Sequence, residues 1–242
     1  MKGIVLAGGR GTRLAPLTEI TNKHLLPVGR EPMIWHSIRQ LVLADVRDIL
    51  VVTSTGHMGD IVQSLGSGVR FGCELTYRVQ EDALGIAHAL GLASGFAQGE
   101  RVVVLLGDNI FEHSIAEHVD AFRRQAQGAR VLLKTVQDPE RFGIAAIDEK
   151  QIIAIEEKPN APKTNHAVVG CYMYDEQVFD IVSGLKRSPR GEYEITDVNN
   201  SYIGREQLAF GIVKGRWTDA GTFESLAEAN SILLDNGNQI LP

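Results

Sequence analysis

The first thirty residues constrain the fold of this chain more than any other stretch. Residues 4–7 form a short apolar run, Ile-Val-Leu-Ala, which predicts a buried β-strand. Three glycines, Gly8, Gly9 and Gly11, follow at once. Glycine permits a sharp turn and a close approach to a ligand because it has no Cβ atom, and free backbone N–H groups in such a loop can bind anions. We therefore expect a strand followed by an anion-binding loop.

Two cations near the loop indicate that the anion is a polyphosphate. Arg13 supplies a planar, permanently charged group suited to phosphate, and Lys23 supplies a point charge further along. The loop is not a Walker A loop, because no Lys-Ser or Lys-Thr follows at the required spacing. It is not the dinucleotide-binding fingerprint either, because Leu14 stands where the third glycine belongs. On these residues alone, a glycine-rich turn with a solvated Arg and Lys is the alternative.

Composition excludes several classes of protein. A hydrophobic content of 44% with 22% charged residues is ordinary for a soluble globular protein. The net charge of −6 offers no basic surface for nucleic acid or an anionic membrane, so local cations or a metal must meet any substrate phosphates. We find no signal segment and no apolar run of membrane-spanning length. Two cysteines are too few for a disulfide framework. We expect a cytoplasmic enzyme without nucleic-acid or membrane partners.

The order of predicted elements indicates an α/β fold. In the first half, strands alternate with helices: helix 32–44, strand 49–52, helix 58–65, strand 75–79, helix 85–96 and strand 102–106. This alternation predicts a parallel, three-layer sheet. The second half has strands at 131–135, 144–147, 152–155 and 168–174, then helices at 176–183, 194–202 and 223–234. The short links between those strands predict antiparallel or mixed pairing added to the same sheet. Because no linker separates the halves, residues 1–242 predict a single domain.

Carboxylates at the ends of predicted strands are candidate metal ligands. Asp108 directly follows the apolar strand 102–106, and ligands of open α/β sheets bind at the carboxyl ends of strands. A carboxylate there suits Mg²⁺, which prefers one or two carboxylates together with substrate phosphates. An aspartate that caps the next helix is the alternative. Asp219 has similar surroundings and strengthens the metal interpretation.

Several motifs together resemble a known enzyme family. Residues 6–14, Leu-Ala-Gly-Gly-Arg-Gly-Thr-Arg-Leu, and residues 23–28, Lys-His-Leu-Leu-Pro-Val, closely resemble the signature of the sugar-1-phosphate nucleotidyltransferases. Within that family, the chain is most similar to the glucose-1-phosphate thymidylyltransferases in a short form. Residues 156–159, Glu-Glu-Lys-Pro, and residues 190–197 also match, so the resemblance runs nearly the full length. It implies a three-layer, Rossmann-like nucleotide-diphospho-sugar transferase fold with a mixed, mainly parallel central sheet.

The resemblance implies a nucleotide-binding half at about residues 1–110. The expected nucleotide-binding residues are Leu6, Ala7, Gly8, Gly9, Gly11, Thr12, Arg13, Gln80 and Gly85. The amide of Gln80 offers a donor and an acceptor for a pyrimidine edge, although a polar residue at a strand end is the alternative. The family often has Asp where this chain has Leu84, and Gln where it has His24 and His88. These departures leave the choice between dTTP and UTP open.

The sugar-binding half is expected at about residues 111–242. The resemblance implies that Lys158 binds the sugar phosphate and that Glu157 accepts hydrogen bonds from sugar hydroxyls. A surface charge cluster before a turn is the alternative. The expected sugar-phosphate-binding residues are Asn109, Phe142, Gly143, Glu157, Lys158, Gly170 and Trp217. Residues 190–197 either border this site or cap a helix.

The implied reaction joins dTTP and glucose-1-phosphate to give dTDP-glucose and pyrophosphate. The sugar phosphate is itself the nucleophile, and it is largely dianionic at neutral pH because its second pKa is about 6. No general base is then required, and catalysis rests on positioning and charge stabilisation. We expect Arg13, Lys23 and Asp108 to be catalytic. The resemblance places the second metal ligand at Asp219, which makes Asp108 and Asp219 the expected pair for Mg²⁺ as cofactor.

Two alternatives stay open at this stage. One is a nucleotidyltransferase that uses UTP or another hexose-1-phosphate, and the other is a non-catalytic regulatory domain that binds sugar nucleotides. Family resemblance also implies a homo-oligomer. Long-form thymidylyltransferases continue with further C-terminal helices, so we expect end-product inhibition through their regulatory site to be altered or lost here.

Overall fold

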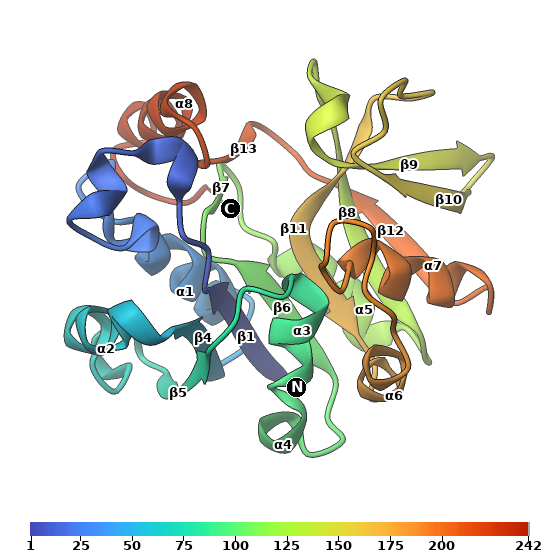
Figure 1. Ribbon diagram of the computed structural model, residues 1–242, viewed down its shortest axis with the longest axis horizontal. Coiled ribbons are helices and arrows are strands. Elements are labelled where there is room, and N and C mark those ends of the chain that lie inside the picture. The colour runs from blue at the N-terminus through green and yellow to red at the C-terminus, as the bar shows by residue number, and fades with distance from the viewer. Residues whose placement is uncertain (242) are drawn as a thin grey trace.

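One mixed sheet of nine strands runs through the computed structural model, which describes residues 1–241 (Figure 1). Its strands are β1 (Lys2–Ala7), β4 (Asp48–Ser54), β5 (Glu74–Gln80), β6 (Val102–Leu106), β8 (Ala129–Thr135), β9 (Gly143–Asp148), β10 (Gln151–Glu157), β11 (His166–Tyr174) and β12 (Leu208–Ile212). They follow the order β10-β9-β11-β6-β1-β4-β5, and β8 joins β11 to β12. The α/β fold and the mixed sheet that the sequence predicts are confirmed.

Strand β1 lies at the centre of the parallel part of the sheet and pairs with β4 and β6. Ile4 and Leu6 face one buried cluster, whereas Val5 and Ala7 face another, as the two-residue period of a strand requires. Both faces of β1 are therefore covered, which explains why its sequence is apolar without alternation. Strands β1, β4, β5 and β6 are parallel, so their carboxyl ends meet at one edge.

Helices cover both faces of the sheet and complete three layers (Figure 1). The α-helices are α1 (Met33–Leu43), α2 (Met58–Leu65), α3 (Ile86–Gly91), α4 (Ser94–Ala97), α5 (Ala116–Arg124), α6 (Val178–Ser183), α7 (Ile195–Ile203) and α8 (Phe223–Asp235). Residues of α1, α2 and α5 pack in the cluster beneath one face. Residues of α3, α6 and α7 pack in the cluster beneath the other face.

Strand β11 joins the two halves of the chain. It pairs antiparallel with β6, where Cys171 lies opposite Leu105, and it also pairs with β8 and β9. The antiparallel β9–β10 ribbon extends the sheet beyond β11. The prediction that second-half strands add to the same sheet is therefore confirmed.

Residues 10–30 fold as a loop, as predicted, and not as a long helix. The loop contains the 3₁₀ turns η1 (Thr12–Leu14), η2 (Leu17–Glu19) and η3 (Lys23–Leu25), and the paired strands β2 (Pro27–Val28) and β3 (Glu31–Pro32) follow. Leu14 and Leu26 pack with Ile232 and Leu233 of α8 in a third apolar cluster. This packing anchors the loop beside α8, as Figure 1 shows.

Some elements differ from the predictions. The predicted helix 85–96 is divided into α3 and α4. Strands β7 (Asn109–Phe111), β12 and β13 (Trp217–Asp219) were not predicted, because such short segments carry little periodic signal. The remaining 3₁₀ turns are η4 (Thr55–His57), η5 (Val69–Phe71) and η6 (Pro139–Arg141). Among residues 1–241, no helix combines the length and apolar character needed to cross a membrane.

Candidate active site

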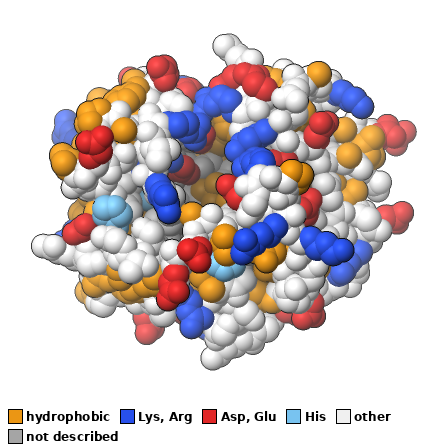
Figure 2. Space-filling view, in the orientation of Figure 1, with side chains coloured by type: hydrophobic (Ala, Val, Ile, Leu, Met, Phe, Trp, Pro, Cys, Tyr) orange, Lys and Arg blue, Asp and Glu red, His pale blue; other side chains and the backbone are white. Residues whose placement is uncertain are grey.

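A cavity of about 350 Å³ opens where β1, β5 and β6 end. Eight of the nine predicted nucleotide-binding residues line it: Leu6, Gly8, Gly9, Gly11, Thr12, Arg13, Gln80 and Gly85. The ninth, Ala7, is fully buried in the cluster on the opposite face of β1 and does not line the cavity. Figure 2 shows a hollow in this face of the molecule with Lys and Arg side chains around its rim.

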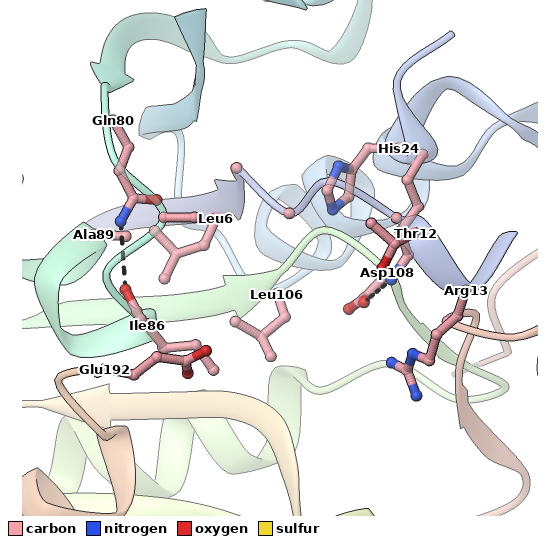
Figure 3. Close-up of a pocket in the computed structure, with 17 residues that line it drawn as sticks. Leu6, Thr12, Arg13, His24, Gln80, Ile86, Ala89, Leu106, Asp108 and Glu192 are labelled. Carbon is pink, nitrogen blue, oxygen red and sulfur yellow. Dashed lines mark hydrogen bonds and ion pairs between the residues drawn. The ribbon is translucent and has the colours of Figure 1, made fainter. Parts of the chain in front are cut away.

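The cavity has an apolar end and a charged end (Figure 3). At the apolar end lie the side chains of Leu6, Ile86, Ala89 and Leu106, with the amide of Gln80 at their edge. The carboxylate of Glu192 also lies at this end, beside Ile86. At the other end lie Arg13 and Asp108. Lys23, which also lines the cavity, pairs with Asp108 there. An apolar slot with polar groups at its edge suits a planar base, and a pair of cations suits phosphates.

The glycine loop has a local steric reason for its sequence. Gly11 has a φ angle of +66°, and a Cβ atom there would lie 2.9 Å from the Cβ atom of Lys23. The hydroxyl of Thr18 donates a 2.9 Å hydrogen bond to the Gly11 carbonyl. Asn22 then caps η3 by accepting a 2.8 Å bond from the backbone N–H of His24. These contacts direct the buried side chain of Lys23 into the charged end of the cavity.

Lys23 and Asp108 form an ion pair at the charged end. The Nζ atom of Lys23 donates to Oδ2 of Asp108, and the Asn109 amide donates to Oδ1 at 2.8 Å. Burial by itself raises the pKa of Asp108, but the Lys23 charge and these hydrogen bonds outweigh it and hold that pKa well below its usual range. Asp108 is therefore ionised at neutral pH.

Asp219 lies beside Asp108 because β13 pairs with β7. The antiparallel register places Asp219 opposite Asn109, and the Ala220 N–H donates to the Asp108 carbonyl at 2.9 Å. Arg141 donates a 2.8 Å hydrogen bond to Oδ1 of Asp219. Burial, together with the negative charge of Asp108, still raises the pKa of Asp219.

The two aspartates fit the predicted Mg²⁺ ion. Two neighbouring carboxylates repel each other, so a cation between them would relieve that repulsion. Residues 1–241 contain no group of three or more His, Cys, Asp or Glu side chains placed to hold a metal. Asp108 and Asp219 would therefore supply two carboxylates only. Mg²⁺ uses a site of that kind when substrate phosphates and water complete its coordination.

His24 also lines the cavity, next to Lys23. Burial and the Lys23 charge lower the pKa of His24 to about 4, so its ring is neutral at neutral pH. Its Nδ1–H donates to Oδ1 of Asn22 at 2.9 Å, because that amide oxygen can only accept. The Nε2 atom of His24 is therefore left as an acceptor.

Four of the predicted sugar-site residues form a packed group. Oδ1 of Asn109 accepts 2.9 Å bonds from Nε1 of Trp217 and from the backbone N–H of Gly170. A Cβ atom on Gly170 would lie 2.6 Å from the Asn109 amide, so this glycine makes room for Asn109. Phe142 packs against Trp217 with ring centroids 5.5 Å apart, and both line a second cavity of about 600 Å³.

The remaining sugar-site residues form a separate group around Glu157. The Thr196 hydroxyl donates to Oε2 of Glu157 at 2.5 Å, and a Cβ atom on Gly143 would lie 3.3 Å from that oxygen. Lys158 is 48% exposed, with Nζ 3.9 Å from Oε1 of Glu157. The structure thus brings the nucleotide residues into one cavity but does not gather the sugar residues into it.

Sequence reasoning assigned no site role to several residues that line the first cavity, among them His24, Ile86, Ala89 and Leu106. It also missed two charged residues. Arg141 holds Asp219 and also bonds to Asp138 at 2.5 Å. Glu192 reaches the first cavity from the second half of the chain (Figure 3). The match of residues 190–197 to the family was the available signal for Glu192, but its position over the cavity depends on the fold.

Comparisons with known proteins identify the family. The family model described as nucleotidyl transferase matches residues 2–236. A glucose-1-phosphate thymidylyltransferase of Neisseria meningitidis is 42% identical over 238 residues, covering 96% of this chain and 82% of the relative. One of Mycolicibacterium smegmatis is 39% identical over 237 residues, covering 96% of this chain and 82% of the relative.

Solved structures are similar as well. A candidate glucose-1-phosphate thymidylyltransferase of Bacillus anthracis, in complex with sucrose, is 54% identical, with a TM-score of 0.94 over 97% of this chain and 96% of that one. A UDP-glucose pyrophosphorylase complexed with UDP-glucose has a TM-score of 0.85 at 23% identity, over 97% of this chain and 98% of that one, and shows a shared fold. These matches confirm the resemblance of the sequence motifs, and the chain belongs to the nucleotidyl transferase family.

Proposed function

We propose that this protein is a glucose-1-phosphate thymidylyltransferase, which converts dTTP and glucose-1-phosphate to dTDP-glucose and pyrophosphate. One observation carries the proposal: a single cavity combines an apolar slot edged by Gln80 with a charged end formed by Arg13, Lys23 and Asp108. The names of relatives that cover almost the whole chain support the same activity.

The proposed chemistry is an in-line displacement at the α-phosphorus of the nucleotide. A sugar-phosphate oxygen forms the new P–O bond, and the bond to the bridging oxygen breaks, so pyrophosphate leaves with that electron pair. Lys23 lies where it can offset the charge on the α-phosphate, and Arg13 lies where it can stabilise the leaving group. We assign Lys158, whose side chain is exposed, to the incoming sugar phosphate.

We further propose that Asp108 and Asp219 hold Mg²⁺. When bound, the ion would neutralise charge on the reacting phosphates. Without it, the Lys23–Asp108 ion pair keeps Asp108 ionised and ready as a ligand. If Asp219 left Arg141 to bind the ion, the Arg141 guanidinium would still be paired with Asp138. Binding of the ion would therefore leave no unpaired charge at Arg141.

Use of UTP in place of dTTP is the second candidate. Thymine and uracil present the same hydrogen-bonding edge to Gln80, so that residue does not separate the two. Leu84 stands where the family often has Asp, and its backbone carbonyl accepts a 2.8 Å bond from the N–H of Tyr193. The preference between dTTP and UTP is therefore measured by comparing the two as substrates.

The test is pyrophosphate release with dTTP, UTP, dCTP, ATP and GTP against glucose-1-phosphate and other hexose-1-phosphates, with Mg²⁺ and with EDTA. We expect the highest rate with dTTP and glucose-1-phosphate, and none with EDTA. A higher rate with UTP would keep the mechanism and change the substrate. Folded protein that releases no pyrophosphate with any substrate of the panel would support a non-catalytic binding domain instead.

That the protein is a cytoplasmic homo-oligomer remains a prediction. Light scattering would test whether it assembles.

A further inference from the structure

His88 contacts the residue that we assign to the base, although it does not itself line the cavity. Nδ1 of His88 lies 2.9 Å from Nε2 of Gln80, whose side chain is buried. The same Nε2 atom lies 3.4 Å from the Gly85 carbonyl oxygen (Figure 3). A carbonyl oxygen can only accept, so the atom that faces it is the amide nitrogen and not the amide oxygen.

This contact decides the role of His88. Both protons of the Gln80 amide nitrogen are directed at acceptors, one at Gly85 and one at His88. Nδ1 of His88 therefore carries the lone pair, and the proton of the neutral ring resides on Nε2. Within residues 1–241, Oε1 of Gln80 accepts no hydrogen bond. A Cβ atom on Gly8 would lie 2.8 Å from Oε1, so the glycine at position 8 leaves this oxygen uncovered.

The ring of His88 is itself held in place. It stacks on Tyr193 with ring centroids 6.1 Å apart and an interplanar angle of 22°. Tyr193 belongs to the second half of the chain, yet its N–H donates to Leu84 at 2.8 Å and its carbonyl accepts from Ala87 at 3.2 Å. The imidazole is thus positioned by both halves, and its lone pair is directed at Gln80.

We propose that His88 is a specificity-determining positioning residue, which holds the Gln80 amide so that only its oxygen faces the base. This inference rests on the proposed function. An acceptor at that position matches the N3–H of uracil or thymine. It repels the N3 lone pair of cytosine. The site should therefore select pyrimidines by the protonation of N3, and His88 should enforce the selection without touching the nucleotide.

Two variants separate the acceptor from the ring. His88→Phe keeps a ring that can stack on Tyr193 but removes the acceptor. His88→Asn removes the ring but places an amide oxygen where Nδ1 stood. His166→Phe makes the same chemical change at the start of β11, outside both cavities, and is the matched control. Calorimetric binding of dUTP and dCTP, without sugar phosphate, isolates recognition of the base edge from turnover.

We expect the wild type to bind dUTP more tightly than dCTP. Loss of one net hydrogen bond predicts that His88→Phe weakens dUTP binding about fivefold to tenfold. Binding of dCTP should not weaken, because the amide, then held only by its 3.4 Å contact with the Gly85 carbonyl, can turn its nitrogen to the base. His88→Asn and His166→Phe should stay within about twofold of the wild type. In turnover assays, His88→Phe should raise KM for dTTP with little change in kcat, because the base is remote from the reacting phosphorus.

Several results would overturn the inference. His88→Phe could keep the wild-type preference for dUTP, or His88→Phe and His88→Asn could lose both nucleotides equally, as a merely structural role predicts. If the wild type turns over dTTP and either of these results is observed, the inference about His88 is wrong but the proposed function stands. A wild type that binds neither nucleotide overturns the proposed function as well.

Discussion

At the scale of single residues, Lys23 and Asp108 each compensate the buried charge of the other. Breaking a buried ion pair leaves one charge uncompensated, which is costly, whereas the intact pair directs both groups into the cavity. Lys23 is also the cation best placed to balance the α-phosphate in the proposed reaction. Its removal should therefore lower turnover and also reduce stability, because Asp108 is left without its partner.

For Lys23→Ala, we expect turnover to fall about 100-fold or more, the usual range for loss of a preorganised charge at the reacting group. The circular dichroism spectrum should match the wild type, because the loop keeps its packing against α8. Lys163→Ala, at an exposed surface position, is the control and should keep full turnover. Near-normal pyrophosphate release by Lys23→Ala would rule out the assignment.

For Asp219, the form of the side chain that favours folding differs from the form that the proposed reaction requires. Its pKa is raised in the folded state, so its neutral form favours folding and its ionised form opposes folding. The stabilisation is complete below the ordinary pKa of 3.8 and is lost as the pH rises through the higher folded value. Asp219→Asn should therefore melt at a higher temperature than the wild type at neutral pH, without Mg²⁺, and at the same temperature below about pH 4.

Asp235→Asn provides a control of opposite sign. Hydrogen bonds from Arg216 and Ser231 lower the pKa of Asp235, so its ionised form favours folding above its ordinary pKa. That variant should be no more stable than the wild type at neutral pH. Asp219→Asn should lose Mg²⁺-dependent pyrophosphate release, whereas Asp235→Asn should keep it. Equal melting temperatures for Asp219→Asn and the wild type across the pH range would contradict the prediction.

At the scale of elements, the junction between β5 and α3 shapes the apolar end of the cavity. Gly85 is the N-cap of α3 and has a φ angle of +98°, and a Cβ atom there would lie 2.6 Å from the Tyr193 carbonyl oxygen. That contact is with backbone, which cannot move aside as a flexible side chain can. Gly85 is therefore required both by its dihedral angle and by the neighbouring segment.

For Gly85→Ala, we expect a loss of about 1–3 kcal/mol in the free energy of unfolding, the range for backbone strain of this kind. Urea denaturation measures the loss, and a raised KM for the nucleotide should accompany it because the junction lines the cavity. Gly95→Ala in α4 is the matched control, since a Cβ atom there meets nothing within 4 Å. Equal urea midpoints for the two variants would show that the junction tolerates a side chain.

At the scale of the whole molecule, β11 makes the two halves interdependent. It covers the edge of β6 with backbone hydrogen bonds, and one apolar cluster includes residues of both halves. We therefore predict that the chain unfolds in a single transition, with equal calorimetric and van't Hoff enthalpies. Residues 1–110 expressed alone should not fold, because β6 would become an open, apolar edge strand. Two separate transitions, or a folded fragment, would contradict the single-domain prediction.

Much of the fold could be predicted because its signals are local. The apolar run of β1, the glycines after it and the alternation of strands and helices each reside in a few consecutive residues. They indicate the parallel α/β half and the position of its cavity, since parallel strands bring their carboxyl ends together. The strand β12 could not be predicted, because it is short and its place depends on pairing with β8, which is far away in the chain.

The sequence by itself therefore determined the strand–loop–cation arrangement around Arg13 and Lys23 and the place of Asp108 at a strand end. Only the tertiary structure decided which residues meet across the chain: Asp219 beside Asp108 through the β7–β13 register, and His88 directed at Gln80 with Tyr193 behind it. The physical reason is that a strand, turn or cap is set by neighbouring residues. Contacts between segments far apart in the chain depend instead on strand register and packing, which no local pattern encodes.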